Sequence, residues 1–275
     1  MTGAPRFSMA QAALYGLMAL WSAFVLMPIL WMVFAAFKSR REIFTDPLGL
    51  PATWTLDSFE RAWGVGLGTF LVNSALVTGL SVLLVVVVSG MAAYVIARSD
   101  SLWLRLLYLL IVAGFAVPAT AVIVPLYQML SAANFVNSHA GIVLVYAAYG
   151  IPFTTILFFA FFLDFPRELE EAARLDGCRP WAVFFRVVVP LSGPAVASAA
   201  IFQAVFIWNE FLLALLLLTQ PAMKTLPVGI LQLQGEFTSD WPAVMAGLSI
   251  ATLPILLLFV LLQRFFVRSL AGLGK

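Results

Sequence analysis

The chain has 275 residues, of which 63% are hydrophobic and only 10% are charged, and its formal net charge is +2. A soluble domain of this length would not be so apolar, so the composition indicates a polytopic membrane protein, and the slight charge gives no indication of nucleic-acid binding. A single cysteine excludes an internal disulfide and a multi-cysteine metal site, and a single histidine, His139, excludes sites built on several histidines.

Six apolar segments are long enough to cross a bilayer as helices. Their approximate bounds are 12–37, 70–97, 102–130, 141–163, 194–218 and 242–266. They predict an all-α fold with six transmembrane helices in a single membrane domain over residues 1–275. The first segment follows a polar lead with Arg6 and has no small-residue cleavage site, so we interpret it as a retained span rather than a cleaved signal.

Prolines interrupt several of these segments. Pro118 and Pro125 lie within the third, and a break is expected in the fourth near Pro152. Membrane helices tolerate proline where neighbouring groups satisfy the freed backbone, so we interpret these positions as static kinks rather than hinges.

Positively charged residues indicate the orientation of the spans. With the N-terminus in the cytoplasm, the cytoplasmic segments hold Arg6, Arg98, Arg105, Arg167, Arg174, Arg179, Arg186, Arg264, Arg268 and Lys275. The outer loops then hold Lys38, Arg40, Arg41, Arg61 and Lys224. The cluster at positions 38–41 runs against the rule, but the overall bias predicts that both termini and the segment 164–193 face the cytoplasm.

The segment 164–193 lies between the fourth and fifth spans and holds the densest charge in the chain. Pro166 suits the first turn of a helix. Acidic residues at positions 168, 170 and 171 favour the same end, and Gly177 favours a helix stop. Pro180 can begin a second short helix, whose apolar face at i, i+3, i+4, i+7 spacing comprises Trp181, Phe184, Phe185 and Val188. The segment therefore predicts two short helices that meet at a glycine turn just outside the membrane.

The pattern of this segment resembles a known family. Glu171-Ala172-Ala173, then Asp176-Gly177, then a basic and aromatic helix ending in Val189-Pro190-Leu191, resembles the EAA loop of bacterial ATP-binding-cassette (ABC) importer permeases. With Trp208-Asn209-Glu210-Phe211 downstream, it is similar to the carbohydrate-uptake branch, and most to the smaller permease of a maltose-type system. The likeness covers nearly the whole chain, although Cys178 stands where the family usually has alanine. It implies the type I importer permease fold, multi-pass in the bacterial cytoplasmic (inner) membrane.

The resemblance implies that the segment 164–193 carries a coupling helix seated in a groove of an ATPase subunit. The contact residues that it implies are Glu171, Ala172, Ala173, Arg174, Asp176 and Gly177. There the charged residues pair with the groove, the alanines allow close approach and the glycine makes the bend. Glu170 and Arg174 are also spaced as a local i, i+4 pair, and Asp176 has the alternative role of stabilising the turn. A further implied contact is the tail, at Gly272, Leu273, Gly274 and Lys275.

The implied partners are a homologous larger permease subunit, two ATPase subunits, an external solute-binding protein, membrane lipid and a sugar-like substrate. The sequence has no glycine-rich loop ending in Gly-Lys-Ser or Gly-Lys-Thr, which cradles nucleotide phosphates. It also has no Ser/His/Asp or Cys/His set for nucleophilic catalysis. We therefore expect no cofactor on this chain and no enzymatic activity by itself; ATP and Mg belong to the ATPase subunits.

Polar residues within the fifth span indicate a functional site, because ionisable groups are costly inside a bilayer. The candidates for the translocation path are Gln203, Trp208, Asn209, Glu210 and Tyr149, with the two aromatic residues suited to stacking on a sugar. Hydrogen bonding between helices is the alternative, and we favour it slightly over direct sugar contact.

A secondary transporter or channel that works alone is the alternative function. Such proteins usually carry coupling-ion carboxylates within their spans. Only Glu210 qualifies here, and no internal repeat is evident, so the sequence favours an ATP-driven importer of a sugar or related polar solute.

Overall fold

The computed structural model describes residues 9–235 and 239–272, and this part of the chain is helical. The first helices are α1 (Met9–Ala35), α2 (Arg40–Thr45), α3 (Asp57–Gly64), α4 (Leu67–Ala97), α5 (Leu102–Gly114), α6 (Ala119–Ala132) and α7 (His139–Leu163). They are followed by α8 (Arg167–Leu175), α9 (Pro180–Val183), the π-helical turn η1 (Phe184–Val188), α10 (Val189–Leu191) and α11 (Gly193–Trp208). The last are α12 (Leu212–Leu217), α13 (Leu226–Ile230) and α14 (Trp241–Gly272).

The long apolar helices confirm the predicted all-α membrane fold. Within the described ranges, four helices are long and apolar enough to cross a bilayer: α1, α4, α7 and the Trp241–Leu261 part of α14. Two further candidates are bent pairs, α5 with α6 at 102° and the segment Pro180–Leu191 with α11 at 75°. Counting each bent pair as one span gives six.

The prolines act differently from one span to the next. α5 and α6 are separated by a break that ends at Pro118, whereas Pro125 lies inside α6. The break expected near Pro152 is wrong, because α7 continues through it. Side chains of neighbouring helices bind the backbone just before this proline: Ser89 Oγ donates to Ile151 O at 3.3 Å and Gln203 Nε2 donates to Gly150 O at 3.2 Å. These contacts hold the backbone beside Pro152 to α4 and α11, although the carbonyl that loses its helical donor at a proline is the one four residues earlier, Ala148 O.

The chain divides into two compact units, each packed mainly within itself. Unit 1 comprises residues 1–67 and 230–252, and unit 2 comprises residues 68–229 and 253–275. That residues 1–275 act as one membrane domain stays a prediction.

Unit 2 has two buried apolar clusters. The first packs α7 against α11 and α12, and includes Ile142, Tyr146, Ile207 and Leu217. The second joins α4, α7, α8 and η1 through Ala93, Phe158, Phe162, Phe165, Ala173, Val183, Phe184 and Val188. The second cluster therefore holds the short helix α8 against the membrane helices.

Candidate functional site: the α8 loop and the polar residues of the spans

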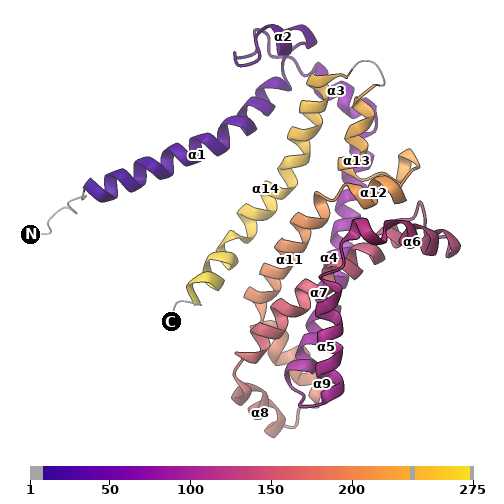
Figure 1. The fold of residues 1–275 in the computed structure, drawn as a ribbon. Coiled ribbons are helices and arrows are strands. Elements are labelled where there is room, and N and C mark those ends of the chain that lie inside the picture. The colour runs from indigo at the N-terminus through magenta and orange to yellow at the C-terminus, as the bar shows by residue number, and fades with distance from the viewer. Residues whose placement is uncertain (1–8, 236–238, 273–275) are drawn as a thin grey trace, which may run out of the picture. The chain divides into compact units, whose positions relative to one another are not determined.

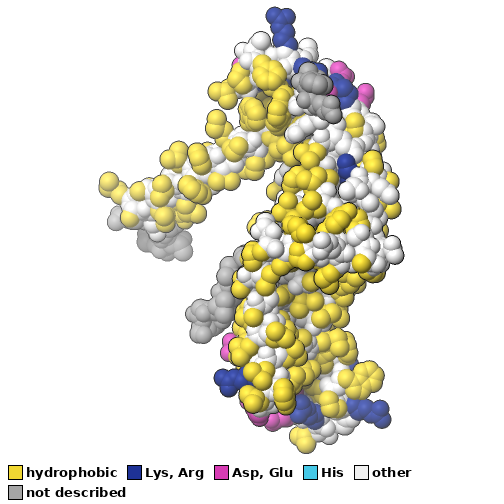
Figure 2. All heavy atoms as spheres, turned by 45° about the vertical axis from the view of Figure 1, so that its right-hand side comes forward, with side chains coloured by type: hydrophobic (Ala, Val, Ile, Leu, Met, Phe, Trp, Pro, Cys, Tyr) yellow, Lys and Arg dark blue, Asp and Glu magenta, His cyan; other side chains and the backbone are white. Residues whose placement is uncertain are grey.

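The helix α8 forms in the middle of the charged segment, as the sequence predicts. Its N-cap is Pro166, its first turn carries Glu168 and Glu170, and its last turn carries Arg174. This order places negative charge at the positive end of the helix dipole and positive charge at the negative end. In Figure 1, α8 and α9 lie together at one end of unit 2, beyond the ends of α5 and α7, and Figure 2 shows charged side chains gathered at that end.

The helix ends at Gly177, whose φ is +85°. The Gly177 N–H donates to Arg174 O and the Cys178 N–H donates to Ala173 O, each at 3.0 Å. These two bonds make a Schellman motif, which satisfies the last carbonyls of a helix and favours glycine at the left-handed position. Cys178 packs against the second apolar cluster, which contains Ala173, as the apolar contact that usually accompanies this motif.

The expected contact residues of α8 do not all face the same way. Glu171, Ala172, Arg174, Asp176 and Gly177 are exposed, whereas Ala173 is buried in the second apolar cluster. The Ala173 side chain therefore packs inside this chain. Of the two alanines, Ala172 is the one that a partner can contact.

One exposed residue of α8 was missed in the sequence. Leu175 is 89% exposed, next to the turn at Gly177. A single exposed leucine is common on protein surfaces, but this one adjoins the expected contact residues Arg174 and Asp176 and is available to a partner. Its position between the charged residues Arg174 and Asp176 was the sequence feature that could have indicated its exposure.

The carboxylate of Glu170 lies inside the molecule and is only 2% exposed as a residue. Its Oε1 accepts from Arg98 Nε at 2.8 Å, and its Oε2 accepts from the Tyr94 hydroxyl at 2.8 Å. The Arg174 guanidinium lies 3.8 Å from Oε2, so the expected i, i+4 pair is also present. The main partners of Glu170 are thus Tyr94 on α4 and Arg98 directly after it, about 70 residues away in sequence, which no local spacing indicates.

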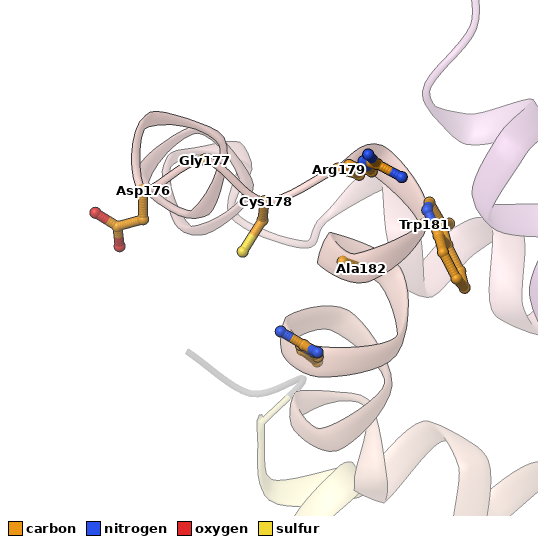
Figure 3. A pocket seen from close by; sticks show the side chains of 7 residues that line it. Asp176, Gly177, Cys178, Arg179, Trp181 and Ala182 are labelled. Atoms are coloured by element: carbon orange, nitrogen blue, oxygen red, sulfur yellow. The ribbon is translucent and has the colours of Figure 1, made fainter.

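A pocket of about 370 Å³ lies beside the α8 turn. It is lined by Asp176, Gly177, Cys178, Arg179, Trp181, Ala182 and Arg186. Figure 3 shows the Asp176 carboxylate on the side of the turn away from Trp181, with the Cys178 sulfur between the turn and the next helix. Two guanidinium groups and an exposed indole make this a basic, partly aromatic surface next to α8.

The expected apolar face of the second short helix is wrong. Phe184 and Val188 are buried, but Trp181 and Phe185 are exposed. The cause is η1, a π-helical turn with i→i+5 hydrogen bonds and so more residues per turn than an α-helix. The α-helical spacing therefore does not persist through these residues.

Of the polar residues of the fifth span, Gln203 binds a neighbouring helix and Asn209 binds the backbone of its own helix. Gln203 is 5% exposed, and its Nε2 donates to Thr154 Oγ1 of α7 at 2.9 Å in addition to Gly150 O. Its Oε1 has no hydrogen-bond partner among the described residues. Asn209 is exposed, and its Nδ2 donates to Val205 O at 2.8 Å. Trp208 is buried and Tyr149 is half-buried against the first apolar cluster.

Glu210 lies in the break between α11 and α12. Its Oε1 accepts from Leu213 N at 2.8 Å and its Oε2 accepts from Ala214 N at 3.1 Å. The Tyr146 hydroxyl donates to the same Oε2 at 2.6 Å. The carboxylate therefore satisfies backbone donors at the start of α12, in the manner of a helix cap.

The basic cluster that runs against the orientation rule lies in unit 1. Lys38 is buried, and its Nζ donates to Asp46 O and Pro47 O at 2.7 and 3.3 Å. Arg61 Nε lies 2.7 Å from Asp240 Oδ2, and Arg40 Nε lies 3.7 Å from Asp240 Oδ1. Burial alone would raise the pKa of Asp240, but hydrogen bonds from Arg61 and the Ala243 N–H and the charges of both arginines lower it below the ordinary value. One carboxylate thus partly offsets the charge of two of the outer-loop arginines.

Two other predictions concern the tail and metal ions. Gly272 is the last residue of α14, and Leu273, Gly274 and Lys275 lie outside the described residues. Within residues 9–235 and 239–261, the ranges whose side chains the structure describes, no group of three or more His, Cys, Asp or Glu is placed to hold a metal ion.

Comparisons with known proteins show which family the chain resembles. Residues 86–272 match the family model described as "Binding-protein-dependent transport system inner membrane component". The probable ABC transporter permease protein YurM of Bacillus subtilis is 38% identical, over 89% of this chain and 82% of the relative. The diacetylchitobiose uptake system permease protein NgcG of Streptomyces coelicolor is 33% identical, over 94% of this chain and 86% of the relative.

Two further comparisons cover a comparable share of the chain. The sulfoquinovosyl glycerol transport system permease protein SmoH of Agrobacterium fabrum is 38% identical, over 90% of this chain and 88% of the relative. A crystal structure of a bacterial ABC transporter involved in the import of the acidic polysaccharide alginate matches with a TM-score of 0.83, covering 96% of this chain and 100% of that chain. Its sequence identity is 20%, so this likeness shows the fold.

Proposed function

Since this chain belongs to the family of binding-protein-dependent transport system inner membrane components, and so is a permease subunit of an ABC importer, we propose that its solute is a carbohydrate or a related polar molecule. The relatives support the substrate class, because the printed names of two of them are those of diacetylchitobiose and sulfoquinovosyl glycerol permeases. In such a system the hydrolysis of ATP belongs to partner subunits, with ATP and Mg bound there rather than on this chain.

The proposed complex contains a homologous larger permease subunit, two ATPase subunits and an external solute-binding protein. Both termini and α8 face the cytoplasm, where the ATPase subunits lie. The excess of arginine in the segments assigned to that side supports this orientation.

The proposed coupling element is α8 with its Gly177 turn. The observation that carries this proposal is that α8 is exposed on one face and attached to the membrane helices on the other. The exposed face includes Glu171, Ala172 and Leu175, whereas Ala173 and Glu170 are buried against α4 and α7. A partner that binds the exposed face and moves can therefore displace the spans, and alternating access follows from that motion.

The translocation path is proposed to pass near the α11–α12 break. Asn209 is exposed there, which supports contact with solute hydroxyl groups, whereas Gln203 is buried between α7 and α11 and would position the path from behind. Tyr149, Trp208 and Glu210 complete the set, with Glu210 also holding the break open through its backbone hydrogen bonds.

The coupling proposal is tested with the purified complex in proteoliposomes, by measuring solute uptake and ATP hydrolysis together. Ala172→Trp places a bulky side chain on the exposed face of α8 and is expected to lower uptake per ATP hydrolysed, or to release the ATPase subunit. Ala52→Trp is the matched control, because Ala52 is an exposed alanine of unit 1. Normal assembly and normal uptake with Ala172→Trp would contradict a coupling role for α8.

The same preparation separates the importer from a transporter that works alone. A chain that carries solute without an ATPase subunit would support uptake in its absence, driven by a solute or ion gradient. The proposal expects no uptake until the ATPase subunits and ATP are added.

A further inference from the structure

The side chain of Arg98 connects three segments at the buried end of α8. Its Nη2 lies 2.7 Å from Glu170 Oε1 of α8, and its Nε donates to the same oxygen at 2.8 Å. Both side chains are largely buried, with 11% of Arg98 and 3% of Glu170 exposed. A buried ion pair contributes little net stability, but its loss leaves an uncompensated charge, so its geometry is strongly held.

The remaining donors of Arg98 bind the end of α7. Nη1 donates to Phe162 O at 2.6 Å, and Nη2 donates to Phe165 O at 3.2 Å. Phe162 is in the last turn of α7, and Phe165 lies in the link from α7 to α8. The planar guanidinium thus fixes α4, α7 and α8 relative to one another, which a lysine ammonium cannot do with the same geometry.

Tyr94 reinforces the same attachment from one turn earlier on α4. Its hydroxyl donates to Glu170 Oε2, and its ring packs against Phe162 and Phe184 with centroids 5.7 and 4.8 Å apart. Both carboxylate oxygens of Glu170 are therefore bound by the C-terminal end of α4 and the residue that follows it. Directional bonds of this kind resist sliding, whereas the apolar contact of Ala173 alone would allow α8 to shift over the cluster.

We propose that Arg98 is a positioning residue that joins α8 rigidly to α4 and α7, so that a displacement of α8 moves both membrane helices with it. The inference rests on the proposed coupling function of α8 and names the attachment through which that function acts. Without Arg98 the ATPase subunit still binds the exposed face of α8, but α8 then moves independently of the spans. The expected consequence is uncoupling: ATP hydrolysis continues and transport falls.

The test replaces the ion pair by a removable covalent link in the complete complex. Arg98→Cys and Glu170→Cys are combined in a Cys178→Ala background, which leaves no unpaired charge from this ion pair and no other cysteine on this chain. Uptake and ATP hydrolysis are measured on the assembled complex before and after treatment with a flexible bifunctional methanethiosulfonate. The control pair is Arg61→Cys with Asp240→Cys, an ion pair of unit 1 with the same 2.7 Å contact.

Uptake per ATP hydrolysed is expected to fall about fivefold or more before the link is made, which corresponds to the smallest couplings usual for allostery. The link should restore at least half of the ratio, because it acts on protein that is already folded and assembled. A merely structural role would not give this recovery. A normal ratio in the unlinked double variant, or an unlinked defect that the link does not repair, would overturn the proposal.

A second variant tests the proposal if the double variant does not assemble. Glu170→Gln keeps the shape of the side chain and one hydrogen-bond acceptor, and is expected to give an intermediate ratio with the ATPase subunit retained. A normal ratio here also overturns the proposal. The coupling function itself is judged separately by Ala172→Trp: if that variant uncouples and the Arg98 and Glu170 variants do not, α8 couples but Arg98 is not its attachment.

Discussion

The Tyr146 hydroxyl donates a 2.6 Å hydrogen bond to Glu210, and the same carboxylate binds the first backbone N–H groups of α12. The pair connects the middle of the buried helix α7 to the point where the fifth span changes direction. The Glu210 carboxylate therefore accepts hydrogen bonds from α7 and from α12. We expect the break between α11 and α12 to depend on this carboxylate.

Loss of the Tyr146 hydroxyl should destabilise the chain modestly. Tyr146→Phe removes one hydrogen bond and is expected to lower the free energy of unfolding by about 1 kcal/mol. Glu210→Ala leaves buried backbone donors unsatisfied and should cost about 1–3 kcal/mol. Thermal unfolding of the detergent-purified complex measures both. Equal midpoints for Glu210→Ala and the wild type would show that the carboxylate does not hold the break.

Gly177→Ala isolates the effect of backbone conformation at the α8 turn. A Cβ at this position would have no atom within 4 Å, so the cost arises from the φ of +85° alone, about 1–2 kcal/mol for a left-handed residue. Gly79→Ala in α4 is the matched control, because its Cβ is equally free of neighbours and no positive φ is present. We expect Gly177→Ala to lower the unfolding midpoint and uptake per ATP, and Gly79→Ala to leave both unchanged or slightly raised.

Leu175→Ala is expected to weaken binding of the ATPase subunit without affecting the fold of this chain. The side chain is exposed in the isolated chain, so its truncation removes no internal packing. Burial against a partner would be worth about 1.5–3 kcal/mol, or roughly tenfold or more in the dissociation constant. Retention of the ATPase subunit during purification at increasing salt measures the change. Leu48→Ala, at an exposed leucine of unit 1, serves as the control and should retain the subunit normally.

The contribution of Asp240 should depend on pH. Because the folded protein holds the pKa of Asp240 below its ordinary value of 3.8, the carboxylate stabilises the fold at every pH above that value. This stabilisation is lost as the pH falls below 3.8 through the lowered pKa. Asp240→Asn should therefore be less stable than the wild type at neutral pH, and the two unfolding midpoints should converge in acid. A constant difference down to the lowest accessible pH would argue against the ion pairs with Arg61 and Arg40.

Local chemistry along the chain was enough to predict α8. Proline at its start, acids in its first turn and glycine after its end agree with the observed helix, and the Schellman motif at Gly177 is a local arrangement of six residues. These features depend on neighbours in sequence, so their physical cause is contained in the sequence. The same holds for the long apolar spans.

The register of the second short helix could not be predicted in this way. The π-helical turn from Phe184 to Val188 buries Phe184 and Val188 and exposes Phe185, although α-helical spacing places all three together. Phe184 and Val188, the two residues that this turn buries, pack in the second apolar cluster. The continuity of α7 through Pro152 is a similar case, because the packing of α7 between other helices, with Ser89 and Gln203 bound to its backbone near this residue, has no local signal in the sequence.

The sequence by itself determined the composition of a membrane protein, the limits of the α8 helix and the EAA pattern that the family comparison bears out. Only the tertiary structure decided which way each of those residues faces: Ala173 inward, Leu175 outward, and Glu170 into a bond with Arg98. The reason is physical. Helix propensity and turn geometry act over a few residues, whereas a buried charge is satisfied by whichever segment the fold brings within hydrogen-bond distance.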